Sequence, residues 1–248
     1  MRLSAVISIH NEEAQLYSCL NTIKFADEIV VLLDKCSDRS EAIASEFSDQ
    51  VLIGDWQNEG ARRNAGIEAC KGPWILEIDA DERVSDELAK EIRSVIEENN
   101  YDWHEILVDN YIGDRLVRWG WGASFGKAAY PGLFKKGAKE WSYQRVHPSL
   151  RWRGVKGPKL KHRLTHYVDN NISDMLNRLD SYSTARARDL RETDQIGSTI
   201  NNLRRFFSRF FKCYFLRQGY REGRYGLLIA ICAGLYPLLS HLKAKLEK

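Results

Sequence analysis

The chain has 248 residues, 44% of them hydrophobic, and a formal net charge of +3. This length and apolar content exclude a disordered polymer and allow one large core, or one domain with an appended piece. Residues 1–100 carry 10 Lys+Arg against 21 Asp+Glu, a balance of −11, whereas the remainder carries 27 against 13, a balance of +14. We therefore expect two surfaces with different partners, the basic one suited to anionic lipid, nucleic acid or a phosphorylated acceptor.

Short apolar runs alternate with amphipathic segments through the first hundred residues. The runs predict strands over residues 5–9, 28–33, 51–53 and 74–78, and the segments between them predict helices over 12–25, 40–47, 60–70 and 85–98. The runs AVISI, IVVLL and WILEI are almost continuously apolar, as in strands that helices cover on both faces. The predicted fold class is α/β, with a Rossmann-like, mostly parallel sheet.

Beyond residue 100 the alternation gives way to a Gly- and Trp-rich stretch, in which Trp119 and Trp121 could stack on a sugar or pack in the core. Residues 151–163 then carry six basic residues and no acid. Helical patterns return, and the last one sets a basic side against an apolar side. Its apolar residues are Ile200, Leu203, Phe206, Phe207, Phe210, Phe211, Tyr214 and Phe215, and its basic residues are Arg204, Arg205, Arg209 and Lys212. This stripe predicts either core packing or a helix lying on an anionic membrane surface, and we favour the membrane.

The cysteines and the first residues of the chain indicate the cellular compartment. The five cysteines are odd in number and widely spaced, and no C-x-x-C pair occurs, which predicts free thiols in a reducing compartment. Met1 leads directly into an apolar run without the pattern of a secretory signal, so we expect a cytoplasmic protein. The longest apolar stretch, residues 225–239, falls short of the ~20 residues needed to cross a bilayer and predicts a buried or interfacial helix.

Polar and acidic side chains follow three of the predicted strands. Asn11 and Glu12 come after the first strand, Asp34 after the second, and Asp79 and Asp81 after the fourth. Parallel strands bring their carboxyl ends to one edge of a sheet, which is where ligands bind. Two alternatives stay open: the D-x-D pair could favour the positive end of the following helix, and Asn11 could be an ordinary helix N-cap, as could Asp38.

Carboxylates without a nearby thiolate suit Mg²⁺ or Mn²⁺, which complete their coordination with substrate phosphates and water. A sugar diphosphate meets that need. Neither G-x-G-x-x-G nor the P-loop pattern occurs, so dinucleotide redox chemistry and P-loop phosphoryl transfer are poorly supported.

Four ordered motifs together resemble the family 2 inverting glycosyltransferases of the GT-A fold, and among them the bacterial lipopolysaccharide-core β-glucosyltransferases. They are residues 6–13 (VISIHNEE), Asp34 with Ser37 and Asp38, residues 62–66 (RRNAG) and residues 74–82 (WILEIDADE). The resemblance implies a GT-A domain over residues 1–165, with a nucleotide-sugar half (1–100) and an acceptor half (101–165). A basic, amphipathic helical extension, residues 166–248, would follow.

The resemblance also implies roles for individual residues. Ile9, Asn11 and Glu12 would line the nucleotide pocket, Asp34 would bind the uracil, and Arg63 would hold the base or the phosphates. Asp79 would face the ribose and the metal, Asp81 would ligate the metal, and His147 would be a further ligand or a diphosphate contact. A hexose, glucose, would pass from a UDP-sugar to an anionic glycolipid such as lipopolysaccharide core, at the cytoplasmic face of the inner membrane.

The chain departs from this family where a catalytic base is expected. The family often has Val-His-Glu where this chain has Val146-His147-Pro148, and proline cannot deprotonate an acceptor hydroxyl. Asp114 and Glu140 are the candidate replacements, with Glu105 a third. Two other functions stay open. One is a sugar-nucleotide nucleotidyltransferase, which also uses metal-binding carboxylates on a similar sheet. The other, because the base is unassigned, is an inactive scaffold that binds UDP-sugar or lipid.

Overall fold

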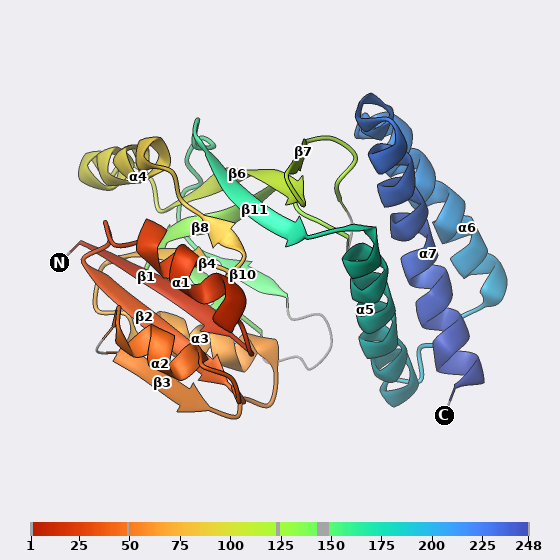
Figure 1. The fold of residues 1–248 in the computed structure, drawn as a ribbon, viewed down its shortest axis with the longest axis horizontal. Helices are drawn as coiled ribbons and strands as arrows, with labels where there is room; N and C mark the ends of the chain where they lie inside the picture. Colours follow the sequence, from red (N-terminus) through yellow and green to blue (C-terminus); the bar gives the residue numbers. More distant parts are fainter. Residues whose placement is uncertain (1, 49, 123–124, 143–148, 248) are drawn as a thin grey trace. The chain divides into compact units, whose positions relative to one another are not determined.

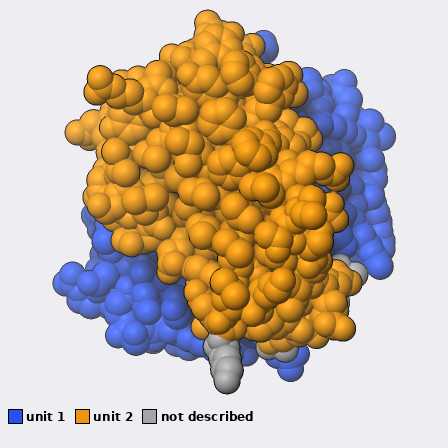
Figure 2. Space-filling model, turned by 90° about the vertical axis from the view of Figure 1, so that its right-hand side faces the viewer, with its two compact units in different colours: residues 1–107, 129–166 blue, residues 108–128, 167–248 orange. Residues whose placement is uncertain are grey.

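The computed structural model describes residues 2–48, 50–122, 125–142 and 149–247 (Figure 1). The chain divides into two compact units, which Figure 2 shows in different colours. Unit 1 comprises residues 1–107 and 129–166, and unit 2 comprises residues 108–128 and 167–248.

Unit 1 begins with the predicted alternation of strands and helices. Its first elements are β1 (Leu3–Ile9), α1 (Glu13–Thr22), β2 (Glu28–Asp34), α2 (Ser40–Ser45), β3 (Gln50–Gly54), α3 (Glu59–Ala69), β4 (Trp74–Ile78), β5 (Glu82–Arg83) and α4 (Asp86–Glu98). Strand β1 pairs in parallel with β2 and β4, and β2 pairs in parallel with β3. The four predicted strands, the four predicted helices and the parallel pairing are therefore confirmed.

The later strands extend the same sheet. They are β6 (Trp103–Ile112), β7 (Arg115–Val117), β8 (Ala129–Lys135) and β11 (Arg163–Asp169), while β9 (Lys139–Trp141) and β10 (Leu150–Trp152) form a separate antiparallel pair. The strand order is β3-β2-β1-β4-β8-β6-β11-β5, with β7 on β6. Strand β8 runs antiparallel to β4, and the two-residue β5 runs antiparallel to β11. Pairing with β11 holds the chain in extended form directly after Asp81.

Helices cover both faces of the parallel part of the sheet. On one face Leu16 of α1 and Leu88 of α4 pack with Ile7 of β1 in a buried cluster. On the other face Ile67 of α3 packs with Val6 of β1. The side chains of β1 alternate between these two clusters because successive residues of a strand point to opposite faces.

Three long helices dominate unit 2: α5 (Ile172–Glu192), α6 (Thr199–Phe211) and α7 (Arg224–Leu246). A π-helical turn (Lys212–Leu216) and a 3₁₀ turn (Gly219–Glu222) connect α6 to α7, and α5 and α6 both pack on α7. Trp121 is buried in this unit's core with Phe125, whereas Trp119 is 38% exposed. Of the two roles open for these tryptophans, core packing holds for Trp121.

Helix α7 is longer than its sequence pattern indicates. It has 23 residues and reaches a mean hydropathy of 1.6, so by length and composition it could cross a membrane. The expectation that this segment is too short to span was therefore wrong. Its most apolar stretch is nevertheless 56% buried inside the protein, which agrees with the prediction of a buried helix.

Gly66 lets α3 approach the sheet closely. A Cβ atom at this position would lie 2.7 Å from Leu32 Cδ1 and 2.8 Å from Val6 Cγ2, both in the core. We predict that Gly66→Ala lowers the free energy of unfolding by roughly 1–2 kcal/mol, because overpacking outweighs the gain in helix propensity. Urea denaturation measures this, and in a Val6→Ala background the same change should cost less. Equal or greater stability of the single variant would contradict the packing argument.

Candidate active site at the strand ends

The acidic side chains that follow β1 and β4 lie close together in unit 1. Burial, followed by the negative charges of Asp81 and Asp79, raises the pKa of Glu12. Glu12 immediately follows Asn11 after β1, whereas the two aspartates follow β4, so parallel pairing of these neighbouring strands brings the three carboxylates to one edge. Such crowding of like charges costs free energy unless a cation or ligand compensates.

Asp81 has the most informative surroundings in this cluster. Its Oδ2 atom lies 3.1 Å from His166 Nε2, and its Oδ1 atom is buried and has no hydrogen-bond partner in the described part of the chain. His166 is buried on β11, opposite Glu82 of β5. A buried carboxylate oxygen without a donor is suited to a cation. Within the described ranges no group of three or more His, Cys, Asp or Glu side chains forms a metal cage, so a cation here would need ligands from a substrate or water.

Asp79 is oriented by a chain of buried charges. Arg63 on α3 contacts Asp79 Oδ1 at 3.4 Å and also contacts Glu77 on β4. Glu77 in turn accepts a hydrogen bond from Lys139 Nζ at 2.5 Å, and both of these side chains are buried. Burial opposes the charge of Arg63, but Asp79, Glu77 and Glu59 hold its pKa well above the usual value. The four residues form the series Lys139–Glu77–Arg63–Asp79, with alternating charge.

At the ends of β1 and β2, polar contacts fix the backbone. Asn11 adopts a left-handed conformation, with φ of 55°, and its Oδ1 accepts a hydrogen bond from Ser37 N at 2.7 Å. It is therefore no helix cap. Asp38 is not the N-cap residue of α2 either, because Arg39 has that position. Its carboxylate nevertheless accepts hydrogen bonds from Glu13 N at 2.9 Å and from Ser40 N at 3.0 Å, the first residues of α1 and α2. The loop between β2 and α2 is thus held to the first residues of both α1 and α2.

Asp34, at the end of β2, already has a cationic neighbour. Arg62 Nη1 donates to Asp34 Oδ2 at 3.0 Å, and both side chains are 18% exposed. The Asp34 carbonyl oxygen lies 2.6 Å from His10 Nδ1. Ile9 is buried at the end of β1. The candidate nucleotide-binding residues therefore sit on ordered strand ends.

The D-x-D pair does not lead into a helix. Strand β5 separates it from α4, whose N-cap is Ser85 and whose first turn contains Asp86 and Glu87. These two acids, and not Asp79 and Asp81, complement the helix dipole. The helix-leader alternative for the motif was therefore wrong.

The candidate bases lie in different settings. Glu140 on β9 is 45% exposed and 3.5 Å from Arg153. Hydrogen bonds from Lys156 and then Lys159 lower the pKa of Glu105, which makes it a weaker base than an ordinary glutamate. Asp114 is exposed in the turn between β6 and β7, in unit 2. His147 lies outside the described residues, as do its neighbours 146 and 148.

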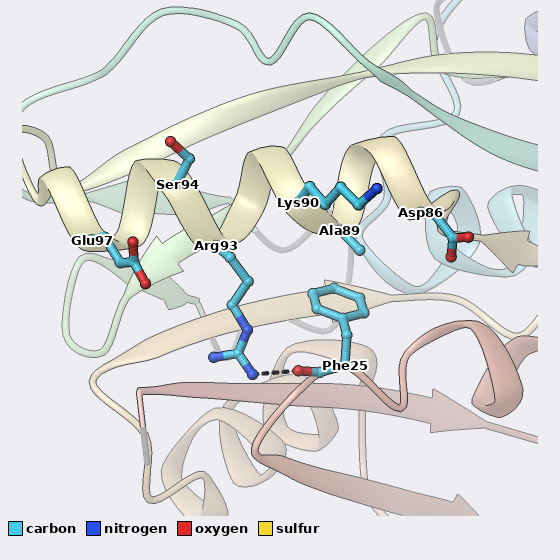
Figure 3. A pocket seen from close by; sticks show the side chains of 7 residues that line it. All are labelled: Phe25, Asp86, Ala89, Lys90, Arg93, Ser94 and Glu97. Carbon is cyan, nitrogen blue, oxygen red and sulfur yellow. Dashed lines mark hydrogen bonds between the residues drawn. The ribbon is translucent and has the colours of Figure 1, made fainter.

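A groove beside α4 lies away from these strand ends. Phe25 and α4 line it, and Phe25 precedes the amino end of β2 (Figure 3). Its one guanidinium, that of Arg93, donates to the Phe25 carbonyl oxygen and to Asp27. Arg93 therefore ties α4 to the loop before β2 across this groove.

Comparisons with known proteins agree in pointing to one enzyme class. A family model described as Glycosyl transferase family 2 matches residues 4–207. The lipopolysaccharide core biosynthesis glycosyltransferase LpsC of Rhizobium meliloti is 25% identical over 263 residues, covering 97% of this chain and 91% of LpsC. A glycosyltransferase of Rickettsia bellii is 26% identical over 232 residues, covering 88% of this chain and 77% of that protein.

Among solved structures, S. aureus TarS 1–349 has a TM-score of 0.50 at 13% identity, covering 77% of this chain and 66% of that chain. The same protein in complex with UDP has a TM-score of 0.51 at 12% identity, covering 90% and 75%. At these identities the likeness shows the fold alone. It confirms the predicted α/β architecture with its helical carboxyl-terminal part.

The buried charge series makes Glu77 a stability determinant. We predict that Glu77→Gln lowers the free energy of unfolding by about 3 kcal/mol, because Lys139 and Arg63 lose their shared counter-charge. Glu59→Gln, which removes an exposed partner of Arg63, should cost less than about 0.5 kcal/mol. Urea denaturation of both variants measures the difference, and similar costs would contradict this assignment.

The pH dependence of the Glu77 effect has a definite sign. Although burial opposes ionisation, Lys139 and Arg63 lower the pKa of Glu77 below its ordinary 4.5. The contribution of ionised Glu77 to the free energy of unfolding is therefore fully present above pH 4.5. It is lost as the pH falls through the lower pKa that Glu77 has in the folded state. The stability gap between wild type and Glu77→Gln should narrow in acid.

Proposed function

The chain is a member of glycosyl transferase family 2, and we propose that it transfers a hexose, glucose, from a UDP-sugar to a glycolipid acceptor with inversion at the sugar carbon. One observation carries the proposal: Glu12, Asp79 and Asp81 crowd one edge of the sheet, and a buried oxygen of Asp81 has no donor within the described ranges. A divalent cation with a sugar diphosphate would relieve both the repulsion and the missing contact.

We propose that Asp81 and Asp79 hold Mg²⁺ or Mn²⁺. The donor set fits, because hard carboxylate oxygens suit these ions and no described residue donates a hydrogen bond to Asp81 Oδ1. When bound, the cation neutralises charge that grows on the departing diphosphate. His166 fixes the orientation of the Asp81 carboxylate through the other oxygen. His147 remains a proposed further ligand.

In this proposal the nucleotide lies along the ends of β1 and β2. Asp34 accepts a hydrogen bond from the imide N–H of uracil, and Arg62 orients its carboxylate. Ile9, Asn11 and Glu12 line the same pocket. The UDP complex of TarS supports a uridine nucleotide, through likeness of fold. Arg63 contacts Asp79, and its positive charge attracts the phosphates.

The acceptor proposal draws on the relative LpsC, named for lipopolysaccharide core biosynthesis. We propose an anionic glycolipid of that type, reached at the cytoplasmic face of a membrane. Residues 1–165 would carry out transfer, with residues 1–100 holding the donor and 101–165 meeting the acceptor, while residues 166–248 attach to the membrane. Glu140 and Asp114 remain the proposed bases.

Replacing Asp81 tests the proposal directly. We expect Asp81→Asn to lower metal-stimulated UDP-sugar turnover at least roughly 100-fold, because the change removes the charge that holds the cation while preserving shape. Asp86→Asn, at the start of α4 and outside the cluster, should retain turnover. Release of UDP from UDP-glucose and other UDP-sugars, with and without Mn²⁺, provides the measurement. Full metal-stimulated activity in Asp81→Asn would refute the assignment.

A further inference from the structure

Helix α6 and the π-helical turn after it carry two apolar faces, where the sequence pattern indicates one. Phe206 contacts α7 at Gly234, and Phe210 packs against the core of unit 2. A second set of large apolar side chains faces solvent instead, with exposed fractions between 45% and 81%. This exposed face consists of Ile200, Leu203, Phe207, Phe211 and Phe215. Their spacing of three or four residues places them along one side of the helix, away from α7.

Positive charge surrounds the exposed face. Seven basic residues lie between Gln195 and Arg224: Arg204, Arg205, Arg209, Lys212, Arg217, Arg221 and Arg224. The one acid in this segment, Glu222, is buried and accepts hydrogen bonds from the backbone of Arg118 and Trp119. An apolar strip bordered by unneutralised basic side chains complements a surface that is anionic outside and apolar beneath.

A cleft at the start of α6 brings arginines of two helices together. Its volume is about 340 Å³, and Arg186 of α5, Arg204 and Arg205 of α6 and Tyr236 of α7 contribute to its lining. Arg204 makes no hydrogen bond or ion pair with any residue that the structure describes, and Arg186 has only a long contact, 3.8 Å, to Asp189. Arg204 is also one helical turn from Ile200, so the cleft adjoins the exposed apolar face.

Arg209, one turn beyond Arg205, shows the same excess of charge. Its Nη1 atom is buried and has no hydrogen-bond partner among the described residues. Burial and the neighbouring charge of Arg205 lower its pKa, and the groups with the largest effects on it include no carboxylate. The tyrosine ring of Tyr236, 5.6 Å away, gives it a weak cation–π contact. An external anion is the compensation this cluster lacks.

We propose that unit 2 docks on an anionic phospholipid surface, with a headgroup phosphate in the cleft of Arg186, Arg204 and Arg205, and the exposed face of α6 in the interfacial layer. This deepens the proposed attachment of residues 166–248 to a membrane, and it rests on the proposed function for that attachment and for the membrane-embedded acceptor. The docking itself needs neither donor nor metal, so it can be tested apart from sugar transfer.

The test is flotation of the full chain with phosphatidylcholine vesicles that contain or lack phosphatidylglycerol. We expect binding to the anionic vesicles only. Arg204→Gln/Arg205→Gln should weaken the partition coefficient roughly 30-fold, from about fivefold for each basic residue near the surface. Phe207→Ser/Phe211→Ser should weaken it at least roughly tenfold through lost apolar burial. The matched controls Lys161→Gln and Ile172→Ser, also exposed, should float like wild type.

Calorimetric titration with UDP and Mn²⁺ separates this inference from the proposed function. Both double variants should still bind UDP with Mn²⁺. Three outcomes would overturn the docking proposal. Wild type could fail to float with anionic vesicles, or Arg204→Gln/Arg205→Gln could float equally well. Light scattering could instead reveal a dimer that Phe207→Ser/Phe211→Ser dissociates, in which case a second copy of the chain covers this face.

Discussion

Repulsion between carboxylates is the constraint around which unit 1 is organised. Parallel pairing of β1 with β2 and β4 brings Glu12, Asp34 and the D-x-D pair to the same strand ends. Cations therefore have to be supplied from elsewhere in the chain. Helix α3 supplies Arg62 to Asp34 and Arg63 to Glu77 and Asp79. Strand β9 supplies buried Lys139 to Glu77, and His166 contacts Asp81. The acidic edge persists because the fold neutralises part of its charge and leaves part for a ligand.

This neutralisation also ties the parts of unit 1 together. Lys139 and Trp141 both lie on β9. The backbone of Trp141 exchanges two hydrogen bonds with the side chain of Asn64 on α3. Arg63, next to Asn64, lies over the ring of Trp141. The R-R-N-A-G motif thus serves three purposes: its arginines meet the carboxylates, its asparagine holds β9, and Gly66 allows the close approach to the sheet. Residues more than 70 positions apart in sequence set the orientation of Asp79.

The sequence sufficed for the parallel sheet and for the convergence of acids, because hydrophobic periodicity is local and parallel strands end at one edge. It could not indicate β5, since two residues carry no period, and so the partnership of Asp81 with His166 was beyond reach. Nor could it separate Phe206 from Phe207, because which apolar side chains of α6 meet α7 depends on tertiary packing. The buried pair of Glu77 and Lys139 was missed because an acid inside WILEI looks like an interruption of an apolar strand.

Two basic segments of the chain, residues 151–163 and α6, differ in how far neighbouring acids neutralise their charge. The basic segment 151–163 finds acids within unit 1, since Lys156 and Lys159 meet Glu105 and Arg153 meets Glu140. Helix α6 has no such supply among the residues that the structure describes, because the acid that follows it is buried and already bonded to backbone amides. Charge that a fold leaves uncompensated at a fixed place is free to select a partner of opposite sign. The same reasoning underlies both proposals, a cation with a diphosphate at the strand ends of unit 1 and an anionic surface at α6 of unit 2.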